Sequence, residues 1–202
     1  MGFGSLFCLI GNIMSVPDLI VLNKPYGVIC QFSAHEKYPT LKQYVPVPDV
    51  YPAGRLDTDS EGLLLLTANG RLQAKIAQPK YKLIKTYWAQ VEGKPDKQAL
   101  QHLSRGVNLG DFVTAPAQVR VLDAAEIKHL WPRVPPIRER KTVTDFWLQI
   151  GISEGKNRQV RRMCAKVGWP CLRLVRVGIG RLNVFSLDLP LGQWQAVRPE
   201  DL

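Results

Sequence analysis

Residues 54–70 read GRLDTDSEGLLLLTANG, so that a cluster of acids runs directly into four consecutive leucines. The acids are Asp57, Asp59 and Glu61. The leucines, residues 63–66, form a short apolar run bounded by turn-forming residues, a pattern typical of a buried strand. We therefore expect a polar loop that brings carboxylates to the start of a strand. These carboxylates could bind a metal, lie in a solvated turn or carry out chemistry.

The acidic cluster imitates the start of a calcium-binding loop, which needs oxygen ligands at its later positions and a bidentate glutamate at the twelfth. The twelfth position here is Ala68, and the seventh and ninth are Leu63 and Leu65. Aliphatic side chains cannot coordinate a cation, so the sequence excludes calcium. A solvated turn accounts for the acids, but it does not account for Arg55, which faces the same way as Asp57 if the segment is extended.

The composition is that of a folded globular protein, with 46% apolar and 22% charged residues in a chain of 202. Helical and strand patterns alternate irregularly and strands dominate, which predicts an α+β fold. We expect one domain over residues 16–202. Residues 1–15 are an apolar extension without Lys or Arg, which fits neither a signal peptide nor a membrane span and which we expect to be poorly ordered.

Positive charge is concentrated in one quarter of the chain. Residues 131–181 contain twelve Lys and Arg against three Asp and Glu, a net charge of +9 out of +10 for the whole chain. Arginine outnumbers lysine nine to three in this segment. Because arginine suits phosphate and base recognition, a nucleic acid is the partner that the sequence favours over a basic surface with no specific partner.

The cysteines indicate neither a metal site nor a disulfide framework. Cys8, Cys30, Cys164 and Cys171 include no C-x-x-C pair, and the three histidines are scattered along the chain. Reduced thiols in a cytoplasmic protein are the simplest interpretation. We expect no metal, no cofactor and no membrane association.

Several secondary-structure elements can be placed by pattern. Asn69 is suited to cap a helix over residues 70–77, and alternation predicts a strand over 83–91 that carries Lys85 and Tyr87 on one face. The apolar runs 19–22 and 28–32, separated by a Pro-Gly turn, predict a hairpin. Residues 129–141, HLWPRVPPIRERK, hold three prolines and four bases, which predicts a loop. This basic insertion is either solvated or clamps a phosphate backbone, and its charge favours the clamp.

A helix is predicted over residues 157–167, with its stop at Gly168 and Pro170. Its apolar side carries Val160, Met163, Cys164 and Val167, at helical spacing. Its other side carries Arg158, Arg161, Arg162 and Lys166. One face should therefore be core, and the other is a cationic surface or a solvated one.

Four blocks taken together resemble a known family. They are GRLD at 54–57, KTY at 85–87, EGKNRQVRRM at 154–163 and LRLVR at 172–176. In this order they resemble the pseudouridine synthases that act on single uridines of ribosomal RNA, and the resemblance covers roughly residues 17–200. The insertion at 129–141 resembles that of members acting on large-subunit ribosomal RNA. The resemblance implies a mostly antiparallel central sheet flanked by helices, with an RNA-binding cleft and no separate N-terminal RNA-binding domain.

The resemblance also assigns roles to individual residues. Asp57 would be the essential carboxylate, acting as nucleophile or as base while the N-glycosidic bond of uridine breaks and the base rejoins through C5. Tyr87 would pack on the target base and assist proton transfer at C5, and Arg161 would pair with Asp57. Asp59 and Glu61 are then expected to be turn and surface acids. No metal or organic cofactor is required.

The expected partner is large-subunit ribosomal RNA, bound by a monomer. Arg55 would occupy the space left by the extruded nucleotide. The expected RNA-binding residues are Arg55, Arg138, Arg140, Lys141, Arg158, Arg162, Lys166, Arg173 and Arg176. The alternatives are a non-catalytic RNA-binding or ribosome-assembly factor, a synthase acting on small-subunit RNA, and a hydrolase of glycosidic bonds.

Overall fold

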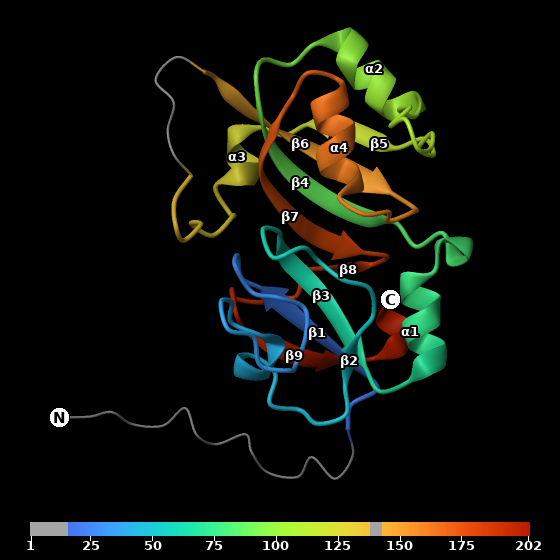
Figure 1. The fold of residues 1–202 in the computed structure, drawn as a ribbon, viewed down its shortest axis with the longest axis vertical. Coiled ribbons are helices and arrows are strands. Elements are labelled where there is room, and N and C mark those ends of the chain that lie inside the picture. The colour runs from blue at the N-terminus through green and yellow to red at the C-terminus, as the bar shows by residue number, and fades with distance from the viewer. Residues whose placement is uncertain (1–15, 138–142) are drawn as a thin grey trace, which may run out of the picture.

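The computed structural model describes residues 16–137 and 143–202 (Figure 1). The strands are β1 (Leu19–Lys24), β2 (Tyr51–Pro52), β3 (Glu61–Thr67), β4 (Lys85–Glu92), β5 (Gln118–Val121), β6 (Asp145–Ile152), β7 (Cys171–Ile179), β8 (Leu182–Asn183) and β9 (Trp194–Val197). The α-helices are α1 (Gly70–Ala77), α2 (Lys97–Arg105), α3 (Ala124–Ile127) and α4 (Gln159–Lys166), and 3-10 helices cover Leu41–Gln43, Pro79–Tyr81 and Pro199–Asp201. The expectations for residues 1–15 and for Arg138, Arg140 and Lys141 lie outside the described residues.

The described strands form one mixed sheet in the order β5-β6-β4-β7-β3-β1-β9, with β2 paired to β3 and β8 to β7. The pairings are antiparallel except that of β3 with β7. Figure 1 shows the two halves of this sheet, with β4, β5, β6 and β7 above and β1, β2, β3 and β9 below. The α+β class and the mostly antiparallel sheet are therefore confirmed.

The two halves meet along a short seam. In the β3–β7 pair, Glu61 lies opposite Val175 and Gly62 opposite Arg176. Gly62 has φ +99°, and a Cβ built on it would lie 2.3 Å from the carbonyl oxygen of Arg176. Only glycine permits both this backbone conformation and this approach. The close contact of the two strands at the seam therefore depends on Gly62.

The leucine run is buried on both faces of the sheet. Leu63 and Leu65 pack into one cluster, which extends across the seam to Trp88 and Val177. Leu64 and Leu66 pack into another cluster on the opposite face, with β1. This explains why β3 shows a continuous apolar run rather than alternation.

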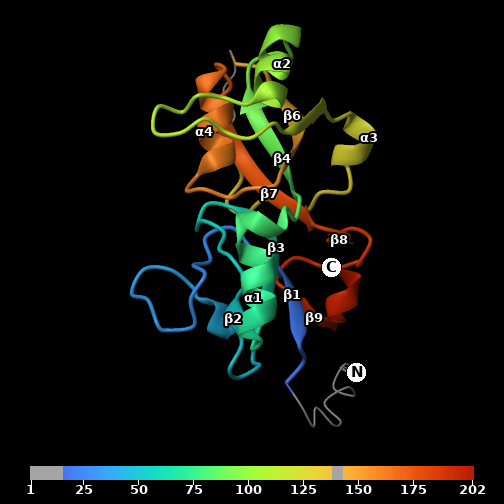
Figure 2. The same ribbon diagram turned by 90° about the vertical axis from the view of Figure 1, so that its right-hand side faces the viewer.

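The cluster that contains Leu63 and Leu65 spans both halves of the sheet. On the opposite face, each half of the sheet has a cluster of its own. One separate cluster joins β4 and β6 to the apolar sides of α2 and α4, and includes Leu103, Val160 and Met163. The other belongs to β1, β3 and the 3-10 helix at Leu41–Gln43. In Figure 2, α3 and α4 lie on opposite faces of the upper half. The helix predicted at 157–167 is confirmed as α4, with its apolar side in the core.

The start of α1 follows the predicted cap. Asn69 Oδ1 accepts hydrogen bonds from the backbone N–H groups of Arg71 and Leu72, at 3.0 and 3.1 Å. A side-chain acceptor at this position satisfies donors that have no partner within the helix. The helix predicted over residues 70–77 is confirmed.

The predicted hairpin over residues 19–32 is wrong. β1 pairs with β3 and β9, and residues 28–32 contribute only an isolated bridge from Ile29 to Thr40. The turn itself exists, and the fully buried Lys24 holds it by donating from Nζ to the carbonyl oxygens of Pro25 and Val28, at 2.9 and 2.7 Å. β1 therefore pairs with strands that are distant in sequence instead of with the neighbouring residues 28–32.

None of the helices in the described ranges is long and apolar enough to cross a membrane.

Candidate active site

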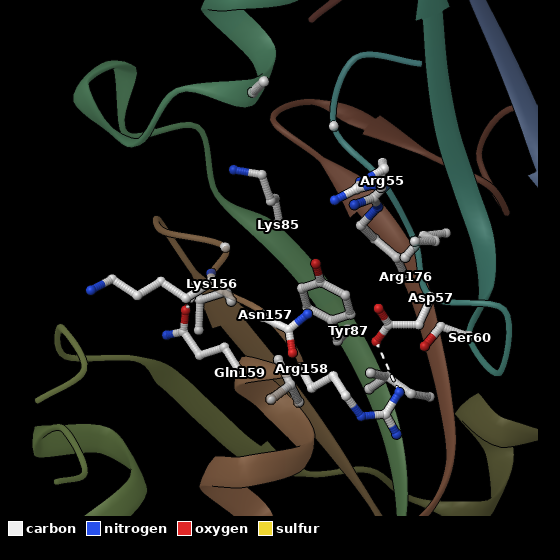
Figure 3. A pocket seen from close by; sticks show the side chains of 17 residues that line it. Arg55, Asp57, Ser60, Lys85, Tyr87, Lys156, Asn157, Arg158, Gln159 and Arg176 are labelled. Carbon is white, nitrogen blue, oxygen red and sulfur yellow. Dashed lines mark hydrogen bonds and ion pairs between the residues drawn. The ribbon is translucent and has the colours of Figure 1, made fainter. Parts of the chain in front are cut away.

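A pocket of about 240 Å³ lies at the seam between the two halves of the sheet (Figure 3). Its wall consists of the loop at residues 54–60, the start of β4, the segment at 152–160 and the middle of β7. The four sequence blocks, which are far apart in the chain, thus all contribute to one place. The pocket is smaller than the roughly 300–1,000 Å³ of typical ligand sites, so it suits one small group such as a nucleobase.

The acidic loop brings Asp57 to this pocket. Gly54 adopts φ +81°, which allows the chain to turn as it leaves β2. A turn then closes from the N–H of Ser60 to the carbonyl of Asp57 at 3.0 Å, and the N–H of Gly27 donates to the carbonyl of Thr58 at 2.8 Å. The side chain of Asp57 is 36% exposed and lines the pocket, so a ligand can reach its carboxylate.

The guanidinium that contacts Asp57 belongs to Arg158 rather than to the predicted Arg161. Arg158 Nη1 lies 3.4 Å from Asp57 Oδ2, and the same guanidinium makes two bonds to the Asp59 carboxylate, at 3.1 and 2.9 Å. Arg158 stands just before α4 with φ +49°, a left-handed conformation that is uncommon outside glycine. This conformation accompanies a side chain that crosses to the acidic loop, instead of lying on the outer face of the helix as the helical pattern predicts.

Arg161 instead binds the backbone of the acidic loop, residues 54–60. Its Nη2 donates to the carbonyl of Asp59 at 2.7 Å and lies 3.4 Å from the Asp59 carboxylate, while Nη1 donates to the carbonyl of Cys171 at 3.1 Å. The side chain is only 12% exposed. Arg161 thus joins α4, β7 and the acidic loop, and it acts on Asp57 through the loop backbone.

Asp59 is more than the turn acid that the sequence suggests. Partial burial acts to raise the pKa of Asp59, but hydrogen bonds from Arg158 and the charge of Arg161 outweigh it and lower the pKa below its usual value. Asp59 therefore stays ionised and competes with Asp57 for the guanidinium of Arg158.

Tyr87 and Lys85 enter the pocket from β4. Tyr87 is 7% exposed and lies opposite Arg176 of β7 in the strand register. Lys85 is also 7% exposed, and its pKa is lowered first by burial and then by the positive charge of Arg176. The structure places Asp57 and Tyr87 in one pocket, as the resemblance implies, and adds Lys85.

The loop that carries Arg158 is held by two residues that sequence reasoning missed. Buried Gln159 donates to Glu154 Oε1 at 2.6 Å and accepts from the N–H of Lys156 at 3.0 Å. The same Glu154 oxygen accepts from the N–H of Ala115 at 2.8 Å. The polar pair thereby fixes the turn into α4. A glutamine directly before an apolar helical position was the available signal.

The predictions for Arg173 and Glu61 are wrong, because both side chains are buried. The sequence predicts that Arg173 binds RNA, yet its side chain is 7% exposed and donates from Nε and Nη2 to the carboxylate of Glu61, at 2.8 Å each. Glu61, expected at the surface, is 1% exposed and also accepts from Trp131 Nε1 at 2.8 Å. The carbonyl of Trp131 accepts from Arg173 at 2.9 Å.

Trp131 ties the start of the basic insertion to the core. Its ring packs against Phe185 at 6.3 Å between centroids, and Arg133 stacks on Tyr26 at 3.8 Å. Residues 131–137 form a loop, as predicted. Its first part is anchored rather than solvated.

Three other arginine or lysine side chains predicted to bind RNA differ in their exposure to solvent. Arg55 and Lys166 are exposed, and Arg55 lines the pocket. Arg162 pairs with the exposed carboxylate of Asp111 and donates to the carbonyl of Leu109 at 3.2 Å. These three side chains can reach a polyanion, Arg162 after exchange of Asp111, and their contact with RNA stays a prediction. In the described parts of the chain, no group of three His, Cys, Asp or Glu side chains could hold a metal ion.

Comparisons with known proteins show what the chain is similar to. The family model described as RNA pseudouridylate synthase matches residues 18–166. A ribosomal large subunit pseudouridine synthase E from Xanthomonas campestris pv. campestris is 55% identical over 188 residues, covering 90% of this chain and 98% of that relative. A protein of the same name from Vibrio parahaemolyticus is 51% identical over 180 residues, covering 89% and 74%. A crystal structure of a pseudouridylate synthase matches with a TM-score of 0.73 at 28% identity, covering 91% and 71%.

Proposed function

The chain belongs to the RNA pseudouridylate synthase family, and we infer that Asp57 is the carboxylate with which this isomerase converts a uridine of large-subunit ribosomal RNA into pseudouridine. The observation that carries this proposal is the position of Asp57. It is the acid of the 54–60 loop whose carboxylate lines the pocket at the seam, beside Tyr87 and within 3.4 Å of an arginine. A carboxylate among arginines has no use in simple phosphate binding, because it repels the RNA backbone.

The reaction breaks the bond between N1 and C1′ of the uridine, turns the uracil and forms a bond between C5 and C1′. Asp57 acts next to the ribose, as nucleophile at C1′ or as base. The ring of Tyr87 packs on the uracil, and its hydroxyl assists removal of the C5 proton. Arg161 and Arg158 hold the acidic loop so that Asp57 faces the pocket, and the hydrogen bonds from Arg158 keep Asp59 ionised.

The target nucleotide reaches this pocket by leaving its stack, at a cost of about a few kcal/mol that contacts to the RNA must offset. Arg55 at the pocket fills the vacated space, and Lys166 and, after exchange of Asp111, Arg162 bind phosphates from α4. Replacing Lys166 with Gln should weaken binding to all RNA sequences alike and reduce the slope of log affinity against log salt by about one unit. Filter binding across a salt series measures this.

The test of the proposal uses unmodified large-subunit ribosomal RNA labelled with tritium at uridine C5. Formation of the C5–C1′ bond releases one tritium to water for each pseudouridine made. We expect Asp57→Asn to bind this RNA normally and to release tritium about 100- to 10,000-fold more slowly than the wild type. Normal release by Asp57→Asn would remove Asp57 from the chemistry.

The same assay separates the competing functions. A purely RNA-binding or assembly factor binds tightly and releases no tritium from any RNA. A glycosidic hydrolase releases free uracil, which chromatography detects, and it generally needs a second carboxylate in a distinct acid or base role. Release from small-subunit RNA alone would reassign the substrate.

The proposal includes a monomeric enzyme working in the cytoplasm, where ribosomal RNA is assembled into subunits. Light scattering of the free protein and of its RNA complex measures the stoichiometry. A stable dimer in both states would contradict the monomer.

A further inference from the structure

Arg176 lines the pocket without an ion pair among the described residues, and part of its guanidinium has no partner. The residue is 3% exposed and lines the pocket from β7. Its Nε donates to the carbonyl of Leu63 at 2.8 Å, which fixes the side chain. Its Nη2 is buried and has no hydrogen-bond partner among the described residues. A buried donor without a partner is uncommon in proteins and points to a ligand that completes the site.

Lys85 is a second cation on the same pocket without an acidic partner. Within residues 16–137 and 143–202, neither Lys85 nor Arg176 forms an ion pair, whereas Arg158, Arg161 and Arg173 all do. Burial and, after it, the positive charge of Arg176 lower the pKa of Lys85, so the two cations act on each other. Two neighbouring cations that are nearly buried and have no ion-pair partner among the described residues are unfavourable in the free protein, and a negatively charged group bound between them relieves this.

The depth of the two cations identifies which part of a nucleotide they meet. An extruded nucleotide inserts its base into the pocket and leaves its phosphates at the rim. Arg176 and Lys85 are almost completely buried, while Arg55 and Lys166 are exposed. In Figure 3 the hydroxyl of Tyr87 points to the side of the pocket where Lys85 and Arg176 lie, and Asp57 lies beside the Tyr87 ring. The buried end therefore receives the base.

Ser60 adds a neutral group to this polar lining. Its residue is 1% exposed, and its hydroxyl has no hydrogen-bond partner among the described residues. Ser60 stands between the turn at Asp57 and the start of β3, and it lines the same pocket. Two unsatisfied buried polar groups in one small pocket indicate a polar occupant rather than an apolar one.

We propose that Arg176, supported by Lys85, binds a carbonyl oxygen of the target uracil and stabilises the negative charge that the ring acquires during the reaction. This inference rests on the proposed function. When the N1–C1′ bond breaks, its electron pair moves onto the uracil, where N1 and the two carbonyl oxygens share the charge. When C5 bonds to C1′, the C5 proton leaves to a base, and N1 takes a proton. No electrons are gained or lost. A fixed donor in a dry pocket stabilises such charge far better than water does.

The test measures the single-turnover rate of tritium release at saturating RNA. We expect Arg176→Gln to slow this rate about 100-fold while RNA affinity and its salt dependence stay unchanged. Arg176→Lys should restore part of the rate because it keeps the charge. Arg105→Gln, an exposed arginine at the end of α2, is the matched control and should behave as the wild type.

A phosphate contact would give the opposite pattern. If Arg176→Gln lowers affinity and reduces the salt slope while the rate at saturation is unchanged, the inference is overturned. If Asp57→Asn is inactive and a folded Arg176→Gln keeps the full rate, the inference fails and the proposed function stands. No tritium release by the wild type on any ribosomal RNA contradicts both.

A second variant covers the case in which Arg176→Gln does not fold, which its thermal melting curve reveals. Lys85→Met leaves Arg176 and its bond to Leu63 in place. We expect it to slow the single-turnover step by a smaller factor than Arg176→Gln, again without loss of RNA affinity. A folded Lys85→Met enzyme with the full rate and weaker RNA binding would overturn the inference independently.

Discussion

Two arginine–carboxylate pairs arise from the same short acidic stretch, and they differ in burial rather than in distance. Glu61 and Arg173 lie 2.8 Å apart with side chains 1% and 7% exposed. Asp59 and Arg158 lie 2.9 Å apart with side chains 37% and 44% exposed. A pair that water reaches can exchange partners with little loss, whereas a buried pair cannot. The inner pair therefore holds the fold together, and the outer pair remains available to substrate.

The inner pair is also the more completely hydrogen-bonded. The Glu61 carboxylate accepts from Arg173 Nε and Nη2 and from Trp131 Nε1. It thereby joins β3, β7 and the start of the basic insertion. The outer carboxylate of Asp59 shares Arg158 with Asp57, so its arginine already has two acceptors to choose between. A phosphate of the RNA would be a third.

The largest expected effect comes from breaking the inner pair. Glu61→Ala leaves Arg173 buried without a counter-charge and removes the acceptor of Trp131, so the free energy of unfolding should fall by about 3–5 kcal/mol. Denaturant unfolding at pH 7 measures it. A loss below about 1 kcal/mol would show that this pair behaves like the exposed one.

The matched control replaces both partners. Glu61→Leu combined with Arg173→Leu leaves no unpaired charge in the core. The double variant should be more stable than either single variant, although Trp131 still lacks its acceptor. Additive losses in this double-mutant cycle would mean that the two side chains do not act as a pair.

A smaller effect comes from Lys24, a buried cation held by carbonyl groups instead of a carboxylate. Burial lowers the pKa of Lys24 from 10.5 to about 8. Between these pH values the unfolded chain holds a proton that the folded chain has released, so this group makes the free energy of unfolding rise with pH from about 8 to 10.5.

A comparison with the Lys24→Met variant separates this contribution from those of other groups that titrate in the same pH range. Denaturant midpoints of both proteins are compared at several pH values. Between pH 8 and 10.5, the wild-type midpoint should rise relative to the midpoint of the variant. A constant difference would mean that Lys24 titrates as an exposed lysine does.

The smallest effect is expected at the outer pair. Asp59→Asn should lower the free energy of unfolding by only about 0.2–1 kcal/mol, because the pair is solvent-exposed. The lowered pKa of Asp59 means that this contribution is present above its ordinary value of 3.8 and is lost as pH falls below it. Unfolding curves at pH 7 and at pH 3 test this, and an equal loss at both would contradict it.

Much of the fold and of the site follows from local patterns. Helix periodicity places α4, the Asn69 cap places α1, and alternation places β4 with Tyr87 facing the pocket. These three elements depend on residues close in sequence, for which composition and spacing are informative. The roles expected of Asp57 and Tyr87 come instead from the resemblance to the family, and the fold brings both residues into one pocket.

What could not be predicted depends on residues far apart in sequence. Arg158 and Asp57 are separated by 101 positions, and Arg173 and Glu61 by 112. Charge counts cannot tell which arginine of the basic quarter turns inward, so they place Arg173 wrongly on the surface. The 19–32 hairpin fails for the same reason, because β1 pairs with distant β3 and β9.

The seam at Gly62 sets a boundary for engineering the enzyme. A side chain at this position, five residues beyond Asp57, would overlap the Arg176 backbone. A library that varies residues 55–59 but keeps Asp57 can change the lining of the pocket while the seam stays closed. A library that extends to residue 62 would discard nearly all of its members as misfolded protein, whatever their effect on the pocket.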